Sequence, residues 1–229
     1  RQTRHLINQP LGYKTDGIVC VEFDGVNESI FYDELKTLSF IEKVALYQTL
    51  PTGEIMTSIK DDKGHHKRIY MLQGTKEYLD ILGIQILEDY GIATVDPEEG
   101  RYYVCNSSLS ALGPYMQEGN IRMYHPQPLC GVVSDFKLGD LKEADLGKIT
   151  LANIISEDIS LKFGCGIIAK VNIDEEEARK LLEEFYRKNG YKDYMFNASI
   201  MRDRIQTGIK EEKNMLKLLT GFSLICILM

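Results

Sequence analysis

The sequence is short of basic residues. Its 27 Lys and Arg stand against 34 Asp and Glu, which gives a formal charge of -7 at pH 7. Proteins that bind nucleic acid gather Lys and Arg on one face, where these residues neutralise phosphate groups. We therefore expect no nucleic-acid partner. Tryptophan is absent too, but 44% of the 229 residues are hydrophobic. That share excludes a disordered tail and suffices for a substantial core.

Cysteine is scarce and scattered. The five cysteines, at positions 20, 105, 130, 165 and 226, form no CxxC pair and no metal-ligand spacing. Each lies in an apolar run, which is typical of a small buried hydrophobic residue. A disulfide between Cys105 and Cys130 stays open as an alternative in an oxidising compartment.

The short motifs of common enzyme classes are missing, since no GxSxG, HExxH or P-loop pattern occurs. His125, Ser134 and Asp135 are the residue types of a hydrolytic set, but no motif supports that interpretation. The four consecutive acids at 174–177 stand where a helix begins, and a helix N-terminus favours negative charge. We expect no catalytic residues and no cofactor.

One segment contains four residues that could bind a metal ion: Asp61, Asp62, His65 and His66. Neighbouring residues of a strand point to opposite faces, so the two adjacent histidines do not easily share one metal ion. The segment also contains Lys63 and Gly64 between two expected strands. We interpret it as the solvated tip of a hairpin, with a transition-metal site as the alternative.

Long apolar runs are absent except at the end of the chain, where Met215–Met229 reads MLKLLTGFSLICILM. A helix needs about 20 apolar residues to cross a bilayer, and this run has about three-quarters of that length. We expect a transmembrane helix that this chain contains only in part. The alternative is the buried side of an ordinary C-terminal helix or strand.

Between these ends, short β-rich runs alternate with a few helical patterns, which predicts an α+β fold. A helix capped by Asn27 places Ile30, Phe31, Leu35 and Leu38 on its apolar side, and a capping pattern at Asp174 opens a helix that ends at Lys188. Another helix is expected at Lys76–Leu82, and helical turns at Asn106–Leu112 are closed by Gly113. Strands are expected at Ile18–Glu22, Val44–Thr49, Glu54–Ile59, Arg68–Gln73, Ile84–Leu87, Tyr102–Cys105, Leu129–Val133 and Leu161–Val171. Inside the last strand, Gly164 and Gly166 indicate a bulge or a close approach of another backbone.

Several phrases, read in order, resemble the extracytoplasmic domain of FtsX-like ABC transporter permeases, the MacB-like periplasmic core domain. LGY at Leu11–Tyr13 resembles the phrase that follows the first transmembrane helix of that family, and YLDILGIQIL at Tyr78–Leu87 and NSSLSALG at Asn106–Gly113 resemble later ones. CGVVSDFKLGDL at Cys130–Leu141 is the most specific match. The motif positions are Leu11, Gly12, Tyr13, Asn106, Gly113, Gly131, Val132, Val133, Asp135 and Phe136.

The resemblance implies an architecture. Residues 1–12 would form a membrane-proximal helical end, and 13–60 with 127–203 a porter-like βαβ subdomain. Residues 61–126 would form an inserted, mainly-β lobe, and 204–229 a helix entering a transmembrane segment. The domain would face the periplasm or the exterior of a bacterial cell membrane.

The resemblance also implies a function without an active site. The domain would couple ATP hydrolysis, carried out by a cytoplasmic ATP-binding subunit or domain, to movement or export of a substrate outside the inner membrane. Its partners would be a second permease subunit or domain and periplasmic or outer-membrane proteins. The alternatives are an extracytoplasmic ligand-binding sensor domain and a soluble enzyme that uses Asp61, His65, His66 or His125.

Overall fold

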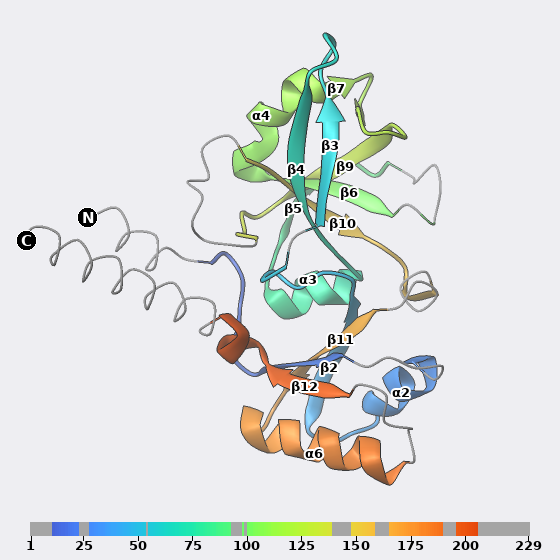
Figure 1. Cartoon of the computed structure of the whole chain (residues 1–229), viewed down its shortest axis with the longest axis vertical. Coiled ribbons are helices and arrows are strands. Elements are labelled where there is room, and N and C mark those ends of the chain that lie inside the picture. The colour runs from blue at the N-terminus through green and yellow to red at the C-terminus, as the bar shows by residue number, and fades with distance from the viewer. Residues whose placement is uncertain are drawn as a thin grey trace, which may run out of the picture.

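Figure 1 shows a computed structural model of the chain, in which strands build one large mixed sheet and a few helices cover it. The structure describes residues 11–22, 28–53, 55–92, 98, 100–138, 148–158, 165–189 and 196–205. The expected α+β class is confirmed. Among these residues no helix is long and apolar enough to cross a bilayer. Gly164 and the apolar run from Met215 lie outside the described ranges.

Four antiparallel strands form one end of the sheet, which we call the four-stranded half. Their order is β12 (Asn197–Ile200), β1 (Ile18–Glu22), β11 (Gly166–Val171) and β2 (Ile41–Tyr47). Two helices, α2 (Glu28–Leu35) and α6 (Glu175–Lys188), cover one face of these strands. Side chains alternate between the two faces of a strand. Val19 of β1 therefore packs with these helices, whereas Ile18 and Cys20 lie in the cluster on the opposite face.

The remaining strands form the larger half, in the upper part of Figure 1. Their order is β4 (His66–Gly74), β10 (Ile149–Ile154), β6 (Arg101–Cys105), β9 (Gln127–Val133), β8 (Asn120–Ile121) and β7 (Met116–Gln117), with β3 (Ile55–Lys60) beside β4 and β5 (Ile86–Asp89) beside β9. The short helix α4 (Leu109–Leu112) packs Leu112 into a third cluster of buried residues. The strands of residues 61–126 do not close a sheet by themselves, because β10 lies between β4 and β6 and pairs with both.

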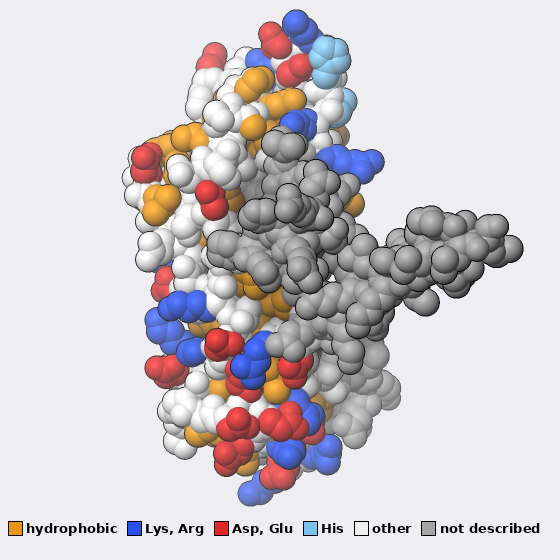
Figure 2. Space-filling model, turned by 90° about the vertical axis from the view of Figure 1, so that its left-hand side faces the viewer, with side chains coloured by type: hydrophobic (Ala, Val, Ile, Leu, Met, Phe, Trp, Pro, Cys, Tyr) orange, Lys and Arg blue, Asp and Glu red, His pale blue; other side chains and the backbone are white. Residues whose placement is uncertain are grey.

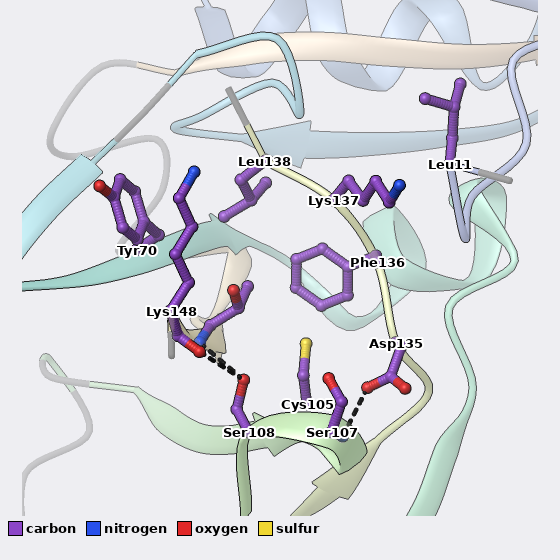
Figure 3. Close-up of a pocket in the computed structure, with 11 residues that line it drawn as sticks. Leu11, Tyr70, Cys105, Ser107, Ser108, Asp135, Phe136, Lys137, Leu138 and Lys148 are labelled. Atoms are coloured by element: carbon purple, nitrogen blue, oxygen red, sulfur yellow. Dashed lines mark hydrogen bonds between the residues drawn. The ribbon is translucent and has the colours of Figure 1, made fainter. Parts of the chain in front are cut away.

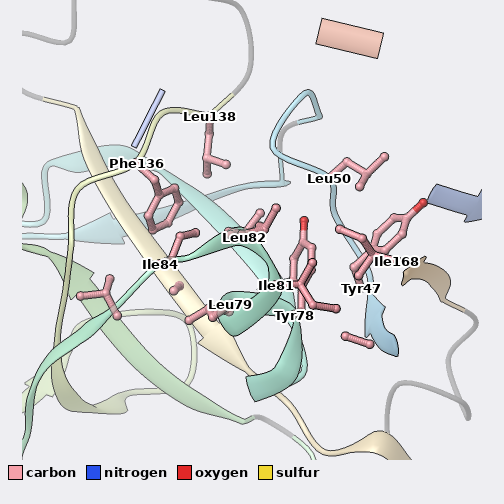
Figure 4. Packing of buried hydrophobic residues seen from close by; sticks show 14 of the residues in the cluster. Tyr47, Leu50, Tyr78, Leu79, Ile81, Leu82, Ile84, Phe136, Leu138 and Ile168 are labelled. Carbon is pink, nitrogen blue, oxygen red and sulfur yellow. The ribbon is translucent and has the colours of Figure 1, made fainter. Parts of the chain in front are cut away.

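The two halves are joined by very little backbone pairing. β2 and β4 share one ladder pair, Tyr47 with Gly74, and three backbone hydrogen bonds flank it, from Gln48 and Thr49 to Gln73 and from Thr75 to Leu46. The helix α3 (Lys76–Leu82) packs against this crossing, and its buried residues Tyr78, Leu79, Ile81 and Leu82 face one apolar cluster that extends over both halves (Figure 4). The Tyr78 hydroxyl donates to the carbonyl oxygen of Thr49 at 2.8 Å, and its ring stacks on the Tyr47 ring at 5.7 Å. Burial and this bond hold the phenol neutral, and burial raises the pKa of Tyr78 well above its ordinary value.

The segments before β1 and after β12 lie on the same face of the sheet. Leu11 and Tyr13 pack against the cluster around α3, and Met201 and Ile205 are buried in it. Residues 201–205 are helical. The two ends of the described chain therefore leave the fold from one side.

Buried and half-buried ion pairs fix these two ends to each other. Glu175 is only 8% exposed, and its carboxylate accepts the backbone N–H of Gly17 and, at 2.6 Å, a guanidinium N–H of Arg202. Arg202 also lies 3.5 Å from the Asp16 carboxylate. One carboxylate of α6 therefore contacts both the segment that enters β1 and the segment that leaves β12.

A second ion pair fixes the outgoing segment to the end of β1. Arg204 donates two parallel hydrogen bonds, both 2.7 Å long, to the two oxygens of Glu22. Such a bidentate pair is the strongest common form of ion pair. The Arg204 guanidinium holds the pKa of the Glu22 carboxyl below its ordinary value of 4.5.

The helix and strand predictions are confirmed in type, with ends that differ by a few residues. α3 has the predicted bounds, and Asp174 caps α6 by accepting the N–H groups of Glu176 and Glu177. The helix at 106–112 is also present, but it is divided into a 3-10 turn at Asn106–Ser108 (η1) and α4. Asn27 lies outside the described ranges.

Three local expectations differ from the structure. Ile30 is 54% exposed, because the buried stripe of α2 runs through Phe31, Tyr32 and Leu35 on the opposite side of the helix. Gly113 follows the last residue of α4, as predicted, but it is not the left-handed glycine expected there: it keeps right-handed helical torsion angles and begins a 3-10 turn, Gly113–Tyr115 (η2). At Gly166 the ladder with β2 is regular, and a Cβ there would lie 2.2 Å from the Tyr47 ring. The register shift of β11 lies at its other end, between Lys170 and Val171.

The Glu22–Arg204 pair predicts a pH-dependent stability. Because the folded-state pKa of Glu22 is lowered, the pair stabilises the fold above pH 4.5, and this stabilisation is lost as the pH falls through the lowered pKa. Arg204→Met should reduce the free energy of unfolding at pH 7 by at most about 1 kcal/mol, since the pair is partly screened by solvent. Urea unfolding at a series of pH values should show this difference shrinking in acid, whereas the exposed Arg68→Met control should show no such trend. A difference that is constant with pH would contradict the assignment.

The close contacts around Gly131 and Gly12 predict that a side chain at either position destabilises the fold. A Cβ on Gly131 would lie 2.0 Å from the Glu88 carbonyl oxygen of β5, and one on Gly12, whose φ is +77°, would lie 2.1 Å from the Asp135 carbonyl oxygen. Alanine at either position should lower the free energy of unfolding by about 2 kcal/mol. Gly113→Ala is the matched control, because Gly113 has helical torsion angles and open space around it. Equal unfolding midpoints for all three alanine variants would show that these contacts do not constrain the fold.

Candidate functional site

The resemblance phrases from different parts of the chain meet beside α3. The backbone N–H of Lys137 donates to the carbonyl oxygen of Leu11 at 3.0 Å, and that of Lys14 donates to the carbonyl oxygen of Leu82 at 2.7 Å. The segment around Gly12 therefore lies between the end of α3 and the residues that follow β9. Gly12 allows this approach because any side chain there would overlap the Asp135 backbone.

Two side chains after β9 connect this segment to its neighbours. Asp135 accepts the backbone N–H of Ser107, in η1, at 2.8 Å. The Ser134 hydroxyl accepts the backbone N–H of Gln85 at 3.0 Å, and the Gln85 carbonyl oxygen accepts the backbone N–H of Ser134 at 2.8 Å. The side chains of Ser134 and Asp135 thus provide hydrogen-bond acceptors for backbone N–H groups of neighbouring segments.

The predicted motif positions divide into those that meet and those that do not. Leu11, Gly12, Tyr13, Asp135 and Phe136 contact one another's segments or the same apolar cluster. Val133 is buried in that cluster, whereas Val132 points to the opposite face of β9 and lies in the third cluster. Gly131 allows the close approach of β5, because a Cβ at this position would overlap the Glu88 carbonyl oxygen. Asn106 and Gly113 are both exposed, at the start of η1 and of η2.

A pocket of about 140 Å³ opens where these segments meet (Figure 3). Its walls combine apolar and polar side chains, and the residues that form them come from five separate segments. They are Leu11, Tyr70, Cys105, Ser107, Ser108, Asp135, Phe136, Lys137, Leu138, Lys148 and Thr150. The sequence pattern alone did not indicate Tyr70, Lys148 or Thr150, although strand alternation places Tyr70 on the same face as Leu72.

The polar wall of the pocket is internally bonded. The Ser108 hydroxyl donates to the Lys148 carbonyl oxygen at 3.3 Å and accepts the Thr150 N–H at 3.2 Å. The Lys148 ammonium lies 4.7 Å from the centre of the Tyr70 ring, within the range of a cation–π interaction. Burial raises the pKa of the Cys105 thiol to about 12, so it stays protonated at neutral pH and is not a thiolate nucleophile.

The metal-ligand candidates Asp61, Asp62, His65 and His66 lie at the exposed tip of the β3–β4 hairpin, as the hairpin interpretation predicted. Asp61 accepts the backbone N–H groups of Lys63 and His65, and its other carboxylate oxygen lies 2.9 Å from the His65 ring nitrogen Nδ1. Figure 2 shows histidine side chains exposed at this end of the molecule. In the part of the chain that the structure describes, no three His, Cys, Asp or Glu side chains are grouped to hold a metal ion.

The three residues considered as a hydrolytic set, His125, Ser134 and Asp135, make other contacts. Ser134 and Asp135 bond backbone groups as described above, and the His125 ring packs edge-on against the ring of Tyr124 at 4.7 Å. Cys105 and Cys130 are not bonded to each other, so the alternative of a Cys105–Cys130 disulfide is not realised.

No family model matches the sequence, and no curated protein matches it. Solved structures do. The periplasmic region of MacB from Actinobacillus actinomycetemcomitans superposes with a TM-score of 0.54 at 16% identity, covering 90% of this chain and 98% of that one. A domain of a protein described as a permease, from Porphyromonas gingivalis, superposes with a TM-score of 0.53 at 14% identity. This match covers 81% of this chain and 89% of that one.

The extracellular domain of the noncanonic ABC-type transporter YknZ from Gram-positive bacteria gives a TM-score of 0.52 at 9% identity, covering 80% of this chain and 99% of that one. All three matches extend over most of both chains, and so the likeness concerns the whole fold. The chain therefore has the fold of the MacB periplasmic region and of the YknZ extracellular domain.

Proposed function

We propose that this chain is a non-catalytic extracytoplasmic domain of an ABC transporter permease. It couples ATP hydrolysis in the cytoplasm to movement of a substrate outside the inner membrane. The observation that carries the proposal is the likeness in fold to two domains of such transporters over nearly their full length. In this proposal residues 13–60 and 127–203 are the porter-like subdomain and 61–126 the inserted lobe.

The attachment of the chain ends supports a mechanical role. The segments before β1 and after β12 lie on one side, and Glu175 binds both of them. A rigid-body mechanism needs the connections to moving helices to be firm at the point where they enter the domain. The ion pairs of Arg202 and Arg204 supply such firm connections at the outgoing end.

The joint between the two halves supports the same role. α3 and the Tyr47–Tyr78 stack fill the space at the single β2–β4 ladder pair, so a displacement at the ends of the chain reaches the larger half through packed side chains. Packed cores move as units rather than deform continuously. The partners in this proposal are a cytoplasmic ATP-binding subunit or domain, a second permease subunit or domain, and external proteins at the far end.

One observation favours a second candidate, an extracytoplasmic ligand-binding sensor domain. The pocket beside α3 is formed by segments from the larger half together with Leu11, which precedes β1. A ligand there would contact the segment that leads into β1. A sensor of this kind would have the same location and no ATP-binding partner.

The test uses the full-length protein that contains this chain, with a protease site inserted at the exposed turn between Lys63 and Gly64. External protease should cleave this site in cells stripped of their outer layer, and the membrane-extracted protein should carry ATP hydrolysis with an identified ATP-binding subunit or domain. A matched site placed in the ATP-binding part is the control and should be protected. External cleavage without any ATP-binding partner would favour the sensor, and protection of the hairpin site would contradict both candidates.

A further inference from the structure

The outer edge of β3 is open. In the part of the chain that the structure describes, β3 pairs with β4 and with no other strand (Figure 1). Among the same residues, the one backbone hydrogen bond on its other edge runs from the N–H of Lys60 to the carbonyl oxygen of Arg122, at 3.1 Å. An unpaired strand edge is a template for another extended chain.

The ladder register shows which backbone groups of β3 face outward. The backbone N–H of Asp61 donates to the carbonyl oxygen of His65, across the hairpin, at 3.0 Å. In an antiparallel pair, residues that bond the partner strand alternate with residues that do not. Met56, Ser58 and Lys60 therefore direct N–H and C=O away from β4, and the outward bond of Lys60 agrees with this assignment. Met56 is 53% exposed and Ser58 is exposed as well, so this part of the edge is accessible.

The inner face of this edge is apolar. Ile55 packs against the cluster of buried residues that contains Ile59, and strand alternation places Thr57 on the same face. Ile59 is fully buried, but Ile55 and Thr57 at the open end are only half-buried. A strand added here would cover both of them, and its side chains on this face should be apolar.

The outer face of the edge is basic. The strands β3 and β4, IMTSIK and HKRIYMLQG, contain Lys60, Lys67 and Arg68 and no acid, in a chain with a net charge of -7. Lys60 and Arg68 are exposed, and neither forms an ion pair with another described residue. Arg68 lies opposite Ser58 in the register, and a serine leaves the long side chain room to reach over the edge. Side chains of an added strand on this face should be acidic.

The same charges disfavour a second copy of this chain as the added strand. Two β3 edges side by side would bring two basic faces together, and like charges on neighbouring strands repel each other. The acids Asp61 and Asp62 lie in the turn beyond Lys60, and Asp61 is already bonded to His65. The charge of the edge is therefore complementary to an acidic segment of another protein.

We propose that β3 binds an extended segment of a partner protein as an added strand, in which apolar and acidic side chains alternate. The apolar side chains cover Ile55 and Thr57, and the acidic ones face Lys60 and Arg68. The inference does not depend on the transporter proposal, because it rests on the strand edge and its charge.

Backbone pairing and side chains have separate roles in this mode of binding. Main-chain hydrogen bonds provide affinity, and alternate side chains provide specificity. The N–H and C=O groups of Met56 and Ser58 bond the segment, which runs along Ile55–Ile59. The bond between Lys60 and Arg122 closes the edge beyond that point.

The experiment titrates the 229-residue chain with the hexapeptide Val-Glu-Val-Glu-Val-Glu, blocked at both ends. Binding should be saturable and should slow hydrogen exchange at the amides of Met56 and Ser58, whereas Thr57 and Ile59 already bond β4. The hexapeptide Val-Lys-Val-Lys-Val-Lys is the control for charge. The glutamate peptide with every amide nitrogen methylated is the control for backbone pairing. Both controls should bind at least tenfold more weakly.

Two variants separate charge from pairing in the protein. The double variant Lys60→Met, Arg68→Met should weaken binding of the glutamate peptide at least fivefold, since each exposed ion pair contributes a few-fold in affinity. Its matched control, Lys43→Met with Lys76→Met, removes two exposed lysines elsewhere and should bind as the wild type does. Ser58→Pro removes an outward N–H and no ladder bond, so it should abolish binding without shifting the thermal unfolding midpoint.

Four results would overturn the proposal. They are no saturable binding of the glutamate peptide, equal affinity for either control peptide, and unchanged affinity in the double variant. The fourth is protection of the Met56 and Ser58 amides that rises with the concentration of the chain alone, which would identify a second copy as the occupant.

Discussion

The burial of α3 at the crossing of β2 and β4 holds the two halves of the sheet together. The backbone contributes one ladder pair with three hydrogen bonds there, and each backbone hydrogen bond adds only about 1 kcal/mol to stability. Leu79, Ile81 and Leu82 are each at most 4% exposed, and burying a side chain of this size contributes about 1.5–3 kcal/mol. The apolar contacts of the helix therefore outweigh the strand pairing. Every segment that lines the pocket is positioned relative to this helix or to the cluster around it.

Much of the fold follows from local sequence patterns. α3 has the predicted bounds, Lys76–Leu82, and α6 begins after its predicted cap Asp174. These features depend on residues close together in the chain, so a single sequence contains the information. Ile30 shows the limit: helical spacing permits it on the apolar side, but tertiary packing selects Phe31, Tyr32 and Leu35.

The candidate site was only partly predictable. The phrases around Gly12 and Asp135 marked two of its segments, but nothing in the sequence places Tyr70 or Lys148 beside them. Their proximity depends on the parallel pairing of β4 with β10, two strands separated by more than 70 residues. Register over such a separation is decided by packing, which has no signature in a single sequence. Gly166 is a second case of this kind. A side chain there would overlap the ring of Tyr47, which comes from another strand.

The pairing of β1 also bears on the order in which the chain folds during synthesis. Among the strands that the structure describes, β1 comes first in the chain, and its two ladder partners, β11 and β12, come last. Most strands of the larger half, in contrast, have a partner that leaves the ribosome before β11 does. The larger half can thus assemble on the nascent chain while β1, with the sequence IVCVE, waits with both edges unpaired. During that interval it is a target for chaperones and a risk for aggregation.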